Sequence, residues 1–236
     1  LLVVYMLLLF LFTRLNPFHI LKKMVPVMLF AFSTSSSNAT IPLNMDTLEK
    51  KVGVDQRITS FTIPLGATIN MDGTAIMQGV AVIFIAQAFG IDLSFAALAT
   101  VVLTAVSASI GTAGVPGVGT IMLAMVFESV GLPAEGVAMI MGVDRILDMG
   151  RTAINVTGDA VVTTCIGKLA GMLNVSVFKG DEPLSLTEIE DEIAHAGEGD
   201  GGEMPVGYSD FTAHGEPTEI GESGNPDKYA DLDIPR

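Results

Sequence analysis

Basic residues, cysteine and histidine are all scarce in this chain of 236 residues. It contains 12 Lys and Arg, one cysteine and three histidines. So few basic residues exclude a nucleic-acid-binding protein, because phosphate contacts need a basic face. The single Cys165 excludes a disulfide framework and a cysteine-based zinc site. The histidines, His19, His195 and His214, are too scattered to indicate a histidine metal cluster.

Charge of either sign is also scarce, and it is unevenly placed. Charged residues make up 16% of the chain and hydrophobic residues 50%, whereas a soluble domain carries about 25% charged residues. Residues 1–172 hold 10 of the 26 acids and 9 of the 12 bases, and residues 173–236 hold the other 16 acids. The sequence therefore predicts a near-neutral apolar body and an acidic tail. The segment 176–236 is rich in Gly, Asp, Glu, Pro and Ser, so we expect it to be disordered.

The apolar segments of the body have lengths that ordinary spanning helices do not explain. Residues 1–12 are apolar but shorter than the roughly 20 residues that span a bilayer, and no basic region precedes them as in a signal peptide. We interpret 1–16 as the end of a transmembrane helix that begins upstream. The apolar stretch 93–106 reaches about 21 Å, short of a hydrocarbon core of about 30 Å. Segments that enter the bilayer, turn at a Gly-rich or Ser-rich tip and leave on the same side explain this pattern, so we predict two re-entrant helical hairpins, over 17–52 and 93–131.

Two longer segments complete the body. The segment 57–90 is long enough to span a membrane, but Asn70, Met71 and Asp72 interrupt it. The segment 134–172 is predicted to be the last transmembrane helix. Half-depth hairpins around a broken helix are typical of a transporter binding site, although a soluble Ala/Gly-rich core could imitate any one of these segments. The predicted fold class is an all-α membrane protein.

The placement of lysine and arginine predicts the orientation of these segments. Basic residues flank the first hairpin and follow the last helix, whereas the loops near 90–94 and 131–136 contain acids and no base. Because cytoplasmic loops carry the excess of Lys and Arg, we expect the first hairpin to enter from the cytoplasm and the second from outside. The tail is then cytoplasmic.

The last predicted helix carries polar residues along one face. These residues follow each other at spacings of 4, 4, 3 and 4, which keeps them within about 80° of arc: Asp144, Asp148, Thr152, Asn155 and Asp159. Arg145 and Arg151 flank the same face. A charge inside the membrane costs roughly 2.5–3.5 kcal/mol, so we interpret the face as a pathway in which Arg binds a carboxylate and carboxylates bind cations. The alternative is a structural ion-pair stripe, for example Asp148 with Arg151.

The broken helix and the hairpin tips carry a second polar pattern. Gly66, Asn70, Thr74 and Gln78 recur every four residues and share a face. If the helix unwinds near Asp72, side-chain oxygens and freed carbonyls converge, and such oxygens are the ligands of hard cations such as sodium. A glycine-kinked packing helix is the alternative. The tips, at 35–37 and 111–117, offer hydroxyls and free N–H groups that attract anions.

Four motifs, in this order, resemble those of the dicarboxylate/amino acid:cation symporter family. They are Ser35-Ser36-Ser37, Asn70-Met71-Asp72-Gly73-Thr74, the stretch 111–117 (Gly-Thr-Ala-Gly-Val-Pro-Gly) and the stretch 148–159 (Asp-Met-Gly-Arg-Thr-Ala-Ile-Asn-Val-Thr-Gly-Asp). The resemblance implies the transport-domain core of an elevator-type transporter that imports aspartate or glutamate with sodium. It also implies a homotrimer in the plasma membrane, in contact with lipid, with no enzymatic activity and no organic cofactor.

The resemblance also implies roles for individual residues. Arg151 would bind the side-chain carboxylate of the substrate, for which its planar fork is suited, and Asp148 would bind the amino group. The other implied substrate residues are Ser35, Ser36, Ser37, Thr74, Val115, Arg145, Thr152 and Asn155. The implied sodium ligands are Gly66, Thr68, Asn70, Asp72, Ser109, Ile110, Thr112, Asn155 and Asp159.

The chain departs from the family pattern at two positions. Thr34 stands where archaeal members have Arg before the serines, and Arg145 after Asp144 could supply that charge from the other side. Gln78 stands where eukaryotic members have a Glu associated with proton co-transport, which argues against that coupling.

Two alternatives stay open: a proton-coupled C4-dicarboxylate symporter, disfavoured because Asp148 would have no amino group to bind, and a non-transporting or channel-like fragment.

Overall fold

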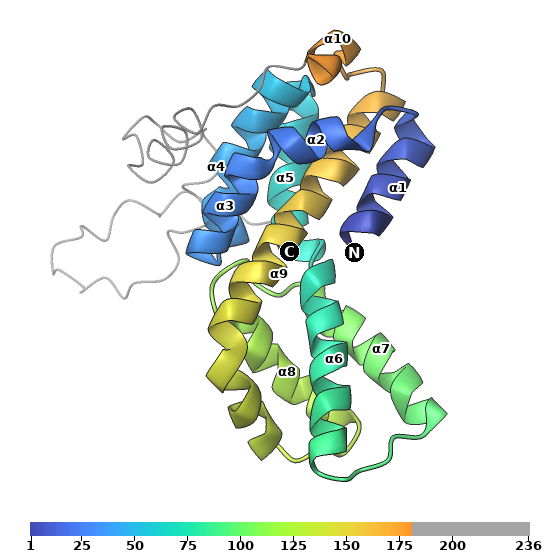
Figure 1. Cartoon of the computed structure of the whole chain (residues 1–236), viewed down its shortest axis with the longest axis vertical. Coiled ribbons are helices and arrows are strands. Elements are labelled where there is room, and N and C mark those ends of the chain that lie inside the picture. Colours follow the sequence, from blue (N-terminus) through green and yellow to red (C-terminus); the bar gives the residue numbers. More distant parts are fainter. Residues whose placement is uncertain (181–236) are drawn as a thin grey trace, which may run out of the picture. The chain divides into compact units, whose positions relative to one another are not determined.

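The computed structural model describes residues 1–180, and within them the regular structure is helical (Figure 1). This confirms the all-α prediction for that part of the chain. The predicted acidic tail lies, from residue 181 on, outside the described residues. The helices are α1 (Leu2–Thr13), α2 (Pro17–Lys23), α3 (Val25–Thr34), α4 (Ser37–Thr47), the π-helical turn η1 (Leu48–Val52), α5 (Gln56–Ile69), α6 (Asp72–Ala88), α7 (Phe95–Ser109), α8 (Val118–Ser129), α9 (Glu135–Leu169) and α10 (Val175–Lys179).

The serine run turns the chain between α3 and α4. Ser35 ends α3 in a left-handed conformation, with φ of 53°. Ser36 then begins α4, because its hydroxyl accepts a hydrogen bond from the N–H of Ala39, as an N-cap does. The two helices pack against each other. We call this pair hairpin 1, and the similar pair of α7 and α8, joined by residues 110–117, hairpin 2.

The long apolar segment between the hairpins is broken at Asn70 and Met71, where the backbone leaves the helical region. Part of the broken hydrogen-bonding pattern is satisfied from outside the segment. The N–H of Gly73 donates to the side-chain oxygen of Asn155 on α9 at 2.8 Å. The break therefore faces the middle of α9, which runs for 35 residues without interruption.

Two hydrophobic clusters form the core of residues 1–180. The first joins α1–α5, η1, α10 and the second half of α9, where Val156 and Ala160 are buried. The second joins α6–α8 with the first half of α9 at Ile140. Figure 1 shows α9 running through both groups, with the break between α5 and α6 where the groups meet. The polar side chains that line the site lie at this boundary and belong to neither apolar cluster.

Much of the outer surface of these helices is apolar. Val3 of α1 and Phe95 of α7 are 80% and 88% exposed. By length and composition, one helical segment of residues 1–180, Gln56–Ala88, could cross a membrane, although Asn70 and Met71 break it. Four further apolar helices, α1, α3, α7 and α8, have 10 to 15 residues, fewer than the roughly 20 that a spanning helix needs.

Candidate functional site

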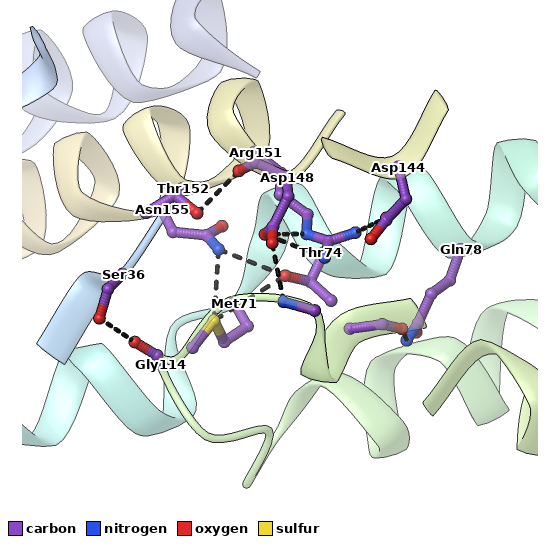
Figure 2. A network of polar contacts seen from close by, with 12 residues as sticks. Ser36, Met71, Thr74, Gln78, Gly114, Asp144, Asp148, Arg151, Thr152 and Asn155 are labelled. Carbon is purple, nitrogen blue, oxygen red and sulfur yellow. Dashed lines mark hydrogen bonds and ion pairs between the residues drawn. The ribbon is translucent and has the colours of Figure 1, made fainter. Parts of the chain in front are cut away.

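A small pocket lies where both hairpin tips, the helix break and the middle of α9 meet (Figure 2). Its lining comes from segments far apart in the sequence: Ser35, Ser37, Met71, Thr74, Thr112, Ala113, Gly114, Val115, Gly119, Asp148, Arg151, Thr152 and Asn155. The space between these side chains is about 10 Å³, enough for about one water molecule. The pocket is therefore too small, in this structure, to hold an amino acid.

A buried ion pair fills one side of this pocket. The guanidinium of Arg151 donates from Nε to Asp148 Oδ1 at 3.0 Å and from Nη1 to Asp144 Oδ1 at 3.2 Å, and its Nη2 lies 2.9 Å from Asp148 Oδ1. The N–H of Gly117, in the tip of hairpin 2, donates to the second oxygen of Asp148 at 2.8 Å. Arg151 is 6% exposed and Asp148 5%. The ion pair of the alternative, structural interpretation does form, and it lies inside the pocket rather than on an outer face of α9.

The two hairpin tips contact each other directly over the pocket. The hydroxyl of Ser36 donates to the carbonyl of Gly114 at 2.8 Å, and the N–H of Asn38 donates to the same carbonyl at 3.1 Å. The hydroxyl of Ser35 is buried at the pocket and has no hydrogen-bond partner among the described residues. An unsatisfied buried hydroxyl costs free energy, so Ser35 is available to a polar ligand.

A second polar cluster lies beside the helix break. Asn70 Nδ2 donates to Asp159 Oδ1 at 2.8 Å, and Asn155 Nδ2 lies 3.2 Å from the sulfur of Met71 and 3.3 Å from the hydroxyl of Thr74. Asp159 is 3% exposed. A side chain at Gly66 would overlap the Asp159 carboxylate, so only glycine lets α5 lie so close.

This cluster fits a small hard cation. Among the described residues, Asp159 has an amide partner and no ion-pair partner. A buried carboxylate without a counter-charge is costly, and a bound cation would supply that charge. The nearby side chains carry carboxylate and amide oxygens, which belong to the ligand set of sodium and other hard cations.

Of the predicted substrate residues, the structure brings eight into the lining of the pocket: Ser35, Ser37, Thr74, Val115, Asp148, Arg151, Thr152 and Asn155. Ser36 lies next to the lining, in the contact between the tips. Arg145 is exposed and does not line the pocket. It is one residue past Asp144, and one residue is about 100° of rotation around a helix, which turns the side chain away. The structure therefore does not bring Arg145 to the place that the sequence interpretation gave it.

The family resemblance implies a second sodium site, formed by the backbone of Ser109, Ile110 and Thr112 together with Thr68. Gly111 N–H donates to the Thr68 carbonyl at 3.0 Å, which joins the tip of hairpin 2 to the end of α5. The side chain of Thr68 bonds to its own helix, and Ile110 is exposed. The hydroxyls of Ser109 and Thr112 also bond to carbonyls of α7.

Several residues at the site lie outside the ligand sets that the sequence predicted, although Met71, Gln78 and Asp144 belong to the motifs and polar patterns that it singled out. Met71 and Gly119 line the pocket, and Asp144 pairs directly with Arg151. The side chain of Gln78 donates to the carbonyl of Gly119 at 3.2 Å and so joins α6 to α8 (Figure 2). Tyr5 of α1 reaches Asp72 at the helix break. Its signal in the sequence was a lone polar side chain in the apolar run 1–12.

Comparisons with known proteins show which proteins this sequence resembles. The family model described as the sodium:dicarboxylate symporter family matches residues 1–169. Excitatory amino acid transporter 3 of Mus musculus is 48% identical over 169 residues, which cover 72% of this chain and 32% of that protein. An excitatory amino acid transporter of Caenorhabditis elegans is 48% identical over 152 residues, 64% of this chain and 30% of that protein. Neutral amino acid transporter B(0) of Mus musculus is 40% identical over 185 residues, 78% and 33% respectively. The chain thus spans about a third of the length of these relatives.

Proposed function

This chain belongs to the sodium:dicarboxylate symporter family, and from that premise we propose that it forms the substrate-binding and sodium-binding part of an importer of acidic amino acids, aspartate or glutamate. The family is one of membrane transporters rather than enzymes. The observation that carries the choice of substrate is the buried pair of Arg151 and Asp148, held in a pocket between two hairpin tips.

The pair explains why the substrate would be an amino acid with a second carboxylate. Such a molecule offers an anion to Arg151 and an ammonium group to Asp148, so both buried charges stay paired when the internal ion pair opens. A neutral amino acid offers no carboxylate to replace Asp148, so Arg151 keeps only Asp144 as its anion. A dicarboxylate leaves Asp148 without a cation. Leaving one member of a buried pair unpaired typically costs about 2–5 kcal/mol, which is enough to select among the three classes.

The hairpin tips would hold the rest of the substrate. The unpartnered hydroxyl of Ser35 and the backbone near Val115 lie at the pocket, where they can bind the main-chain carboxylate. Thr74, Thr152 and Asn155 complete the wall. Because the pocket has no room for an amino acid in its closed state, entry requires the tips to separate, which breaks the bond from Ser36 to Gly114.

Coupling to sodium is proposed at the cluster beside the helix break. Asn70, Asp72, Asn155 and Asp159, with carbonyls near Gly66, would hold the ion. Sodium bound there would supply the positive charge that neutralises the carboxylates, and its gradient would drive uptake. Asn155 belongs to both the cluster and the pocket wall, so its amide links the two sites.

A second ion is proposed at the hairpin 2 tip, near Thr68, Ser109, Ile110 and Thr112. Gln78 cannot titrate, so proton coupling through this position is not part of the proposal.

The membrane architecture and the assembly are also proposed from membership of the family. Hairpins 1 and 2 would be re-entrant, the protein would cross the plasma membrane several times with its tail in the cytoplasm, and three copies would assemble around a scaffold while these helices move as an elevator. The exposed apolar helix faces support contact with lipid or with such a scaffold.

Competition for uptake tests the substrate class. The protein expressed from the complete open reading frame is reconstituted into liposomes, and labelled aspartate is driven by an inward sodium gradient. Unlabelled glutamate should compete strongly, and succinate and serine weakly. If succinate competed as well as glutamate, the amino-group role of Asp148 would be wrong and the dicarboxylate alternative would stand.

A further inference from the structure

One polar side chain in α1 is turned away from the apolar surface of that helix. Tyr5 is 2% exposed, whereas Val3 and Leu7 on the same helix are 80% and 62% exposed. The Tyr5 hydroxyl donates to Asp72 Oδ2 at 3.0 Å, across 67 positions of sequence. Because Asp72 is the first residue of α6, the hydroxyl reaches the helix break itself.

The end of the Tyr5 ring lies between the break and α9. A side-chain carbon at Gly158 would come within 2.5 Å of the Tyr5 hydroxyl oxygen and within 3.0 Å of Asn70 Nδ2. Glycine at 158 therefore makes room for both groups. Asn70 in turn donates to Asp159. The tyrosine thus lies beside both carboxylates of the cation cluster and donates its hydrogen bond to one of them.

We propose that Tyr5 is a positioning residue for the sodium site at the helix break, an inference that rests on the proposed function. A hydrogen bond to one oxygen of Asp72 fixes the direction of the carboxylate and leaves the other oxygen for an ion. A neutral phenol donor does not cancel the charge, so the site keeps its need for a cation. Outer partners of this kind typically change metal affinity by about 10- to 100-fold when they are removed.

The test is the variant Tyr5→Phe, which removes one oxygen atom and keeps the ring. Sodium binding is measured without substrate, on purified protein from the complete open reading frame, as the sodium concentration that gives half of the protection against thermal unfolding, with choline keeping ionic strength constant. We expect this concentration to rise about tenfold. Aspartate affinity at saturating sodium should stay within about twofold, because Tyr5 does not line the pocket.

Two further variants separate positioning from general stability. Thr164→Val removes an equally buried hydroxyl, which bonds to the carbonyl of Ala160 in its own helix, and it should leave the sodium midpoint unchanged. Gly158→Ala displaces the Tyr5 hydroxyl from the side of α9 and should raise the sodium midpoint as Tyr5→Phe does. This variant tests the inference if Tyr5→Phe fails to fold.

A double variant assigns the effect to Asp72. If Tyr5 acts through that carboxylate, Tyr5→Phe should change nothing further in an Asp72→Asn background. The inference is overturned if Tyr5→Phe leaves the sodium midpoint unchanged, or if it shifts the midpoint equally in both backgrounds. Failure of the proposed function looks different, because the unmodified protein would then gain no more protection from sodium than from choline.

Discussion

In the proposed function, Arg151 is the residue on which the choice of substrate depends. It pairs with Asp148 on one side and with Asp144 on the other. All three residues lie on the same face of α9, about one helical turn apart. A guanidinium in this position can exchange one carboxylate partner for another without leaving its place, which suits a site that binds and releases an anion.

Replacing Arg151 with cysteine should therefore abolish aspartate uptake. A loss of about 2–5 kcal/mol corresponds to at least about 30-fold in affinity. Sodium coupling should remain, and small neutral amino acids such as serine could enter because they need no cation for their side chain. Uptake of labelled aspartate and serine by the two proteins measures both effects.

The matched control is Arg145→Cys, six residues earlier on the same helix. Arg145 is exposed, so its loss should change aspartate affinity by less than about threefold. Retained aspartate affinity in Arg151→Cys together with a loss in Arg145→Cys would reverse the roles of the two arginines.

A second prediction for a single residue concerns Asp159 and the binding of sodium. Asp159→Asn keeps the size of the side chain but removes the charge that attracts the cation. Sodium affinity should fall by at least about tenfold, since a direct ligand should matter as much as an outer partner. The control is Asp92→Asn, an exposed carboxylate in the loop between α6 and α7. An unchanged sodium midpoint in folded Asp159→Asn protein would remove Asp159 from the site.

The elements are fixed to each other by polar contacts that reach across the sequence. At the end of the first cluster, the buried ammonium group of Lys23 on α2 donates to the carbonyls of Lys51 at 2.9 Å, Val177 at 2.7 Å and Phe178 at 3.0 Å. This contact joins η1 and α10 to α2, which precedes hairpin 1. Phe178 is fully buried beneath it.

Lys23→Met should therefore loosen α10 without touching the pocket. Leaving buried carbonyls without a donor costs about 1–3 kcal/mol each, so we expect a loss of about 2–4 kcal/mol in the local stability of residues 175–179. Hydrogen–deuterium exchange of that helix measures it. Lys22→Met, an exposed neighbour on the same helix, should leave exchange unchanged. Equal exchange in both variants would show that Lys23 does not hold α10.

Some features of the helices and their connections could be predicted from the sequence, and others could not. The turn at Ser35 and the break at Asn70 carry local signals, because serine caps and Gly-flanked polar residues interrupt apolar helices. The contact of Ser36 with Gly114 and that of Tyr5 with Asp72 are tertiary, and no local spacing encodes them. The role of Arg145 came from the family resemblance, and the structure places its side chain in an exposed position, one residue past Asp144 on α9.

At the scale of the whole molecule, two apolar clusters enclose a polar boundary through which α9 passes. The pocket and the cation cluster both lie at that boundary and share Asn155. In the proposed function, a ligand in one site therefore acts on a residue of the other, which is the physical requirement for coupled transport. The chain covers about a third of its relatives, so the whole transporter is needed to test the coupling.

The most direct test is accumulation of labelled aspartate in proteoliposomes made with the protein from the complete open reading frame. With an inward sodium gradient, aspartate should accumulate above its external concentration. With choline in place of sodium, accumulation should disappear even when an inward proton gradient is imposed. Equal accumulation in choline with only the proton gradient would contradict the account.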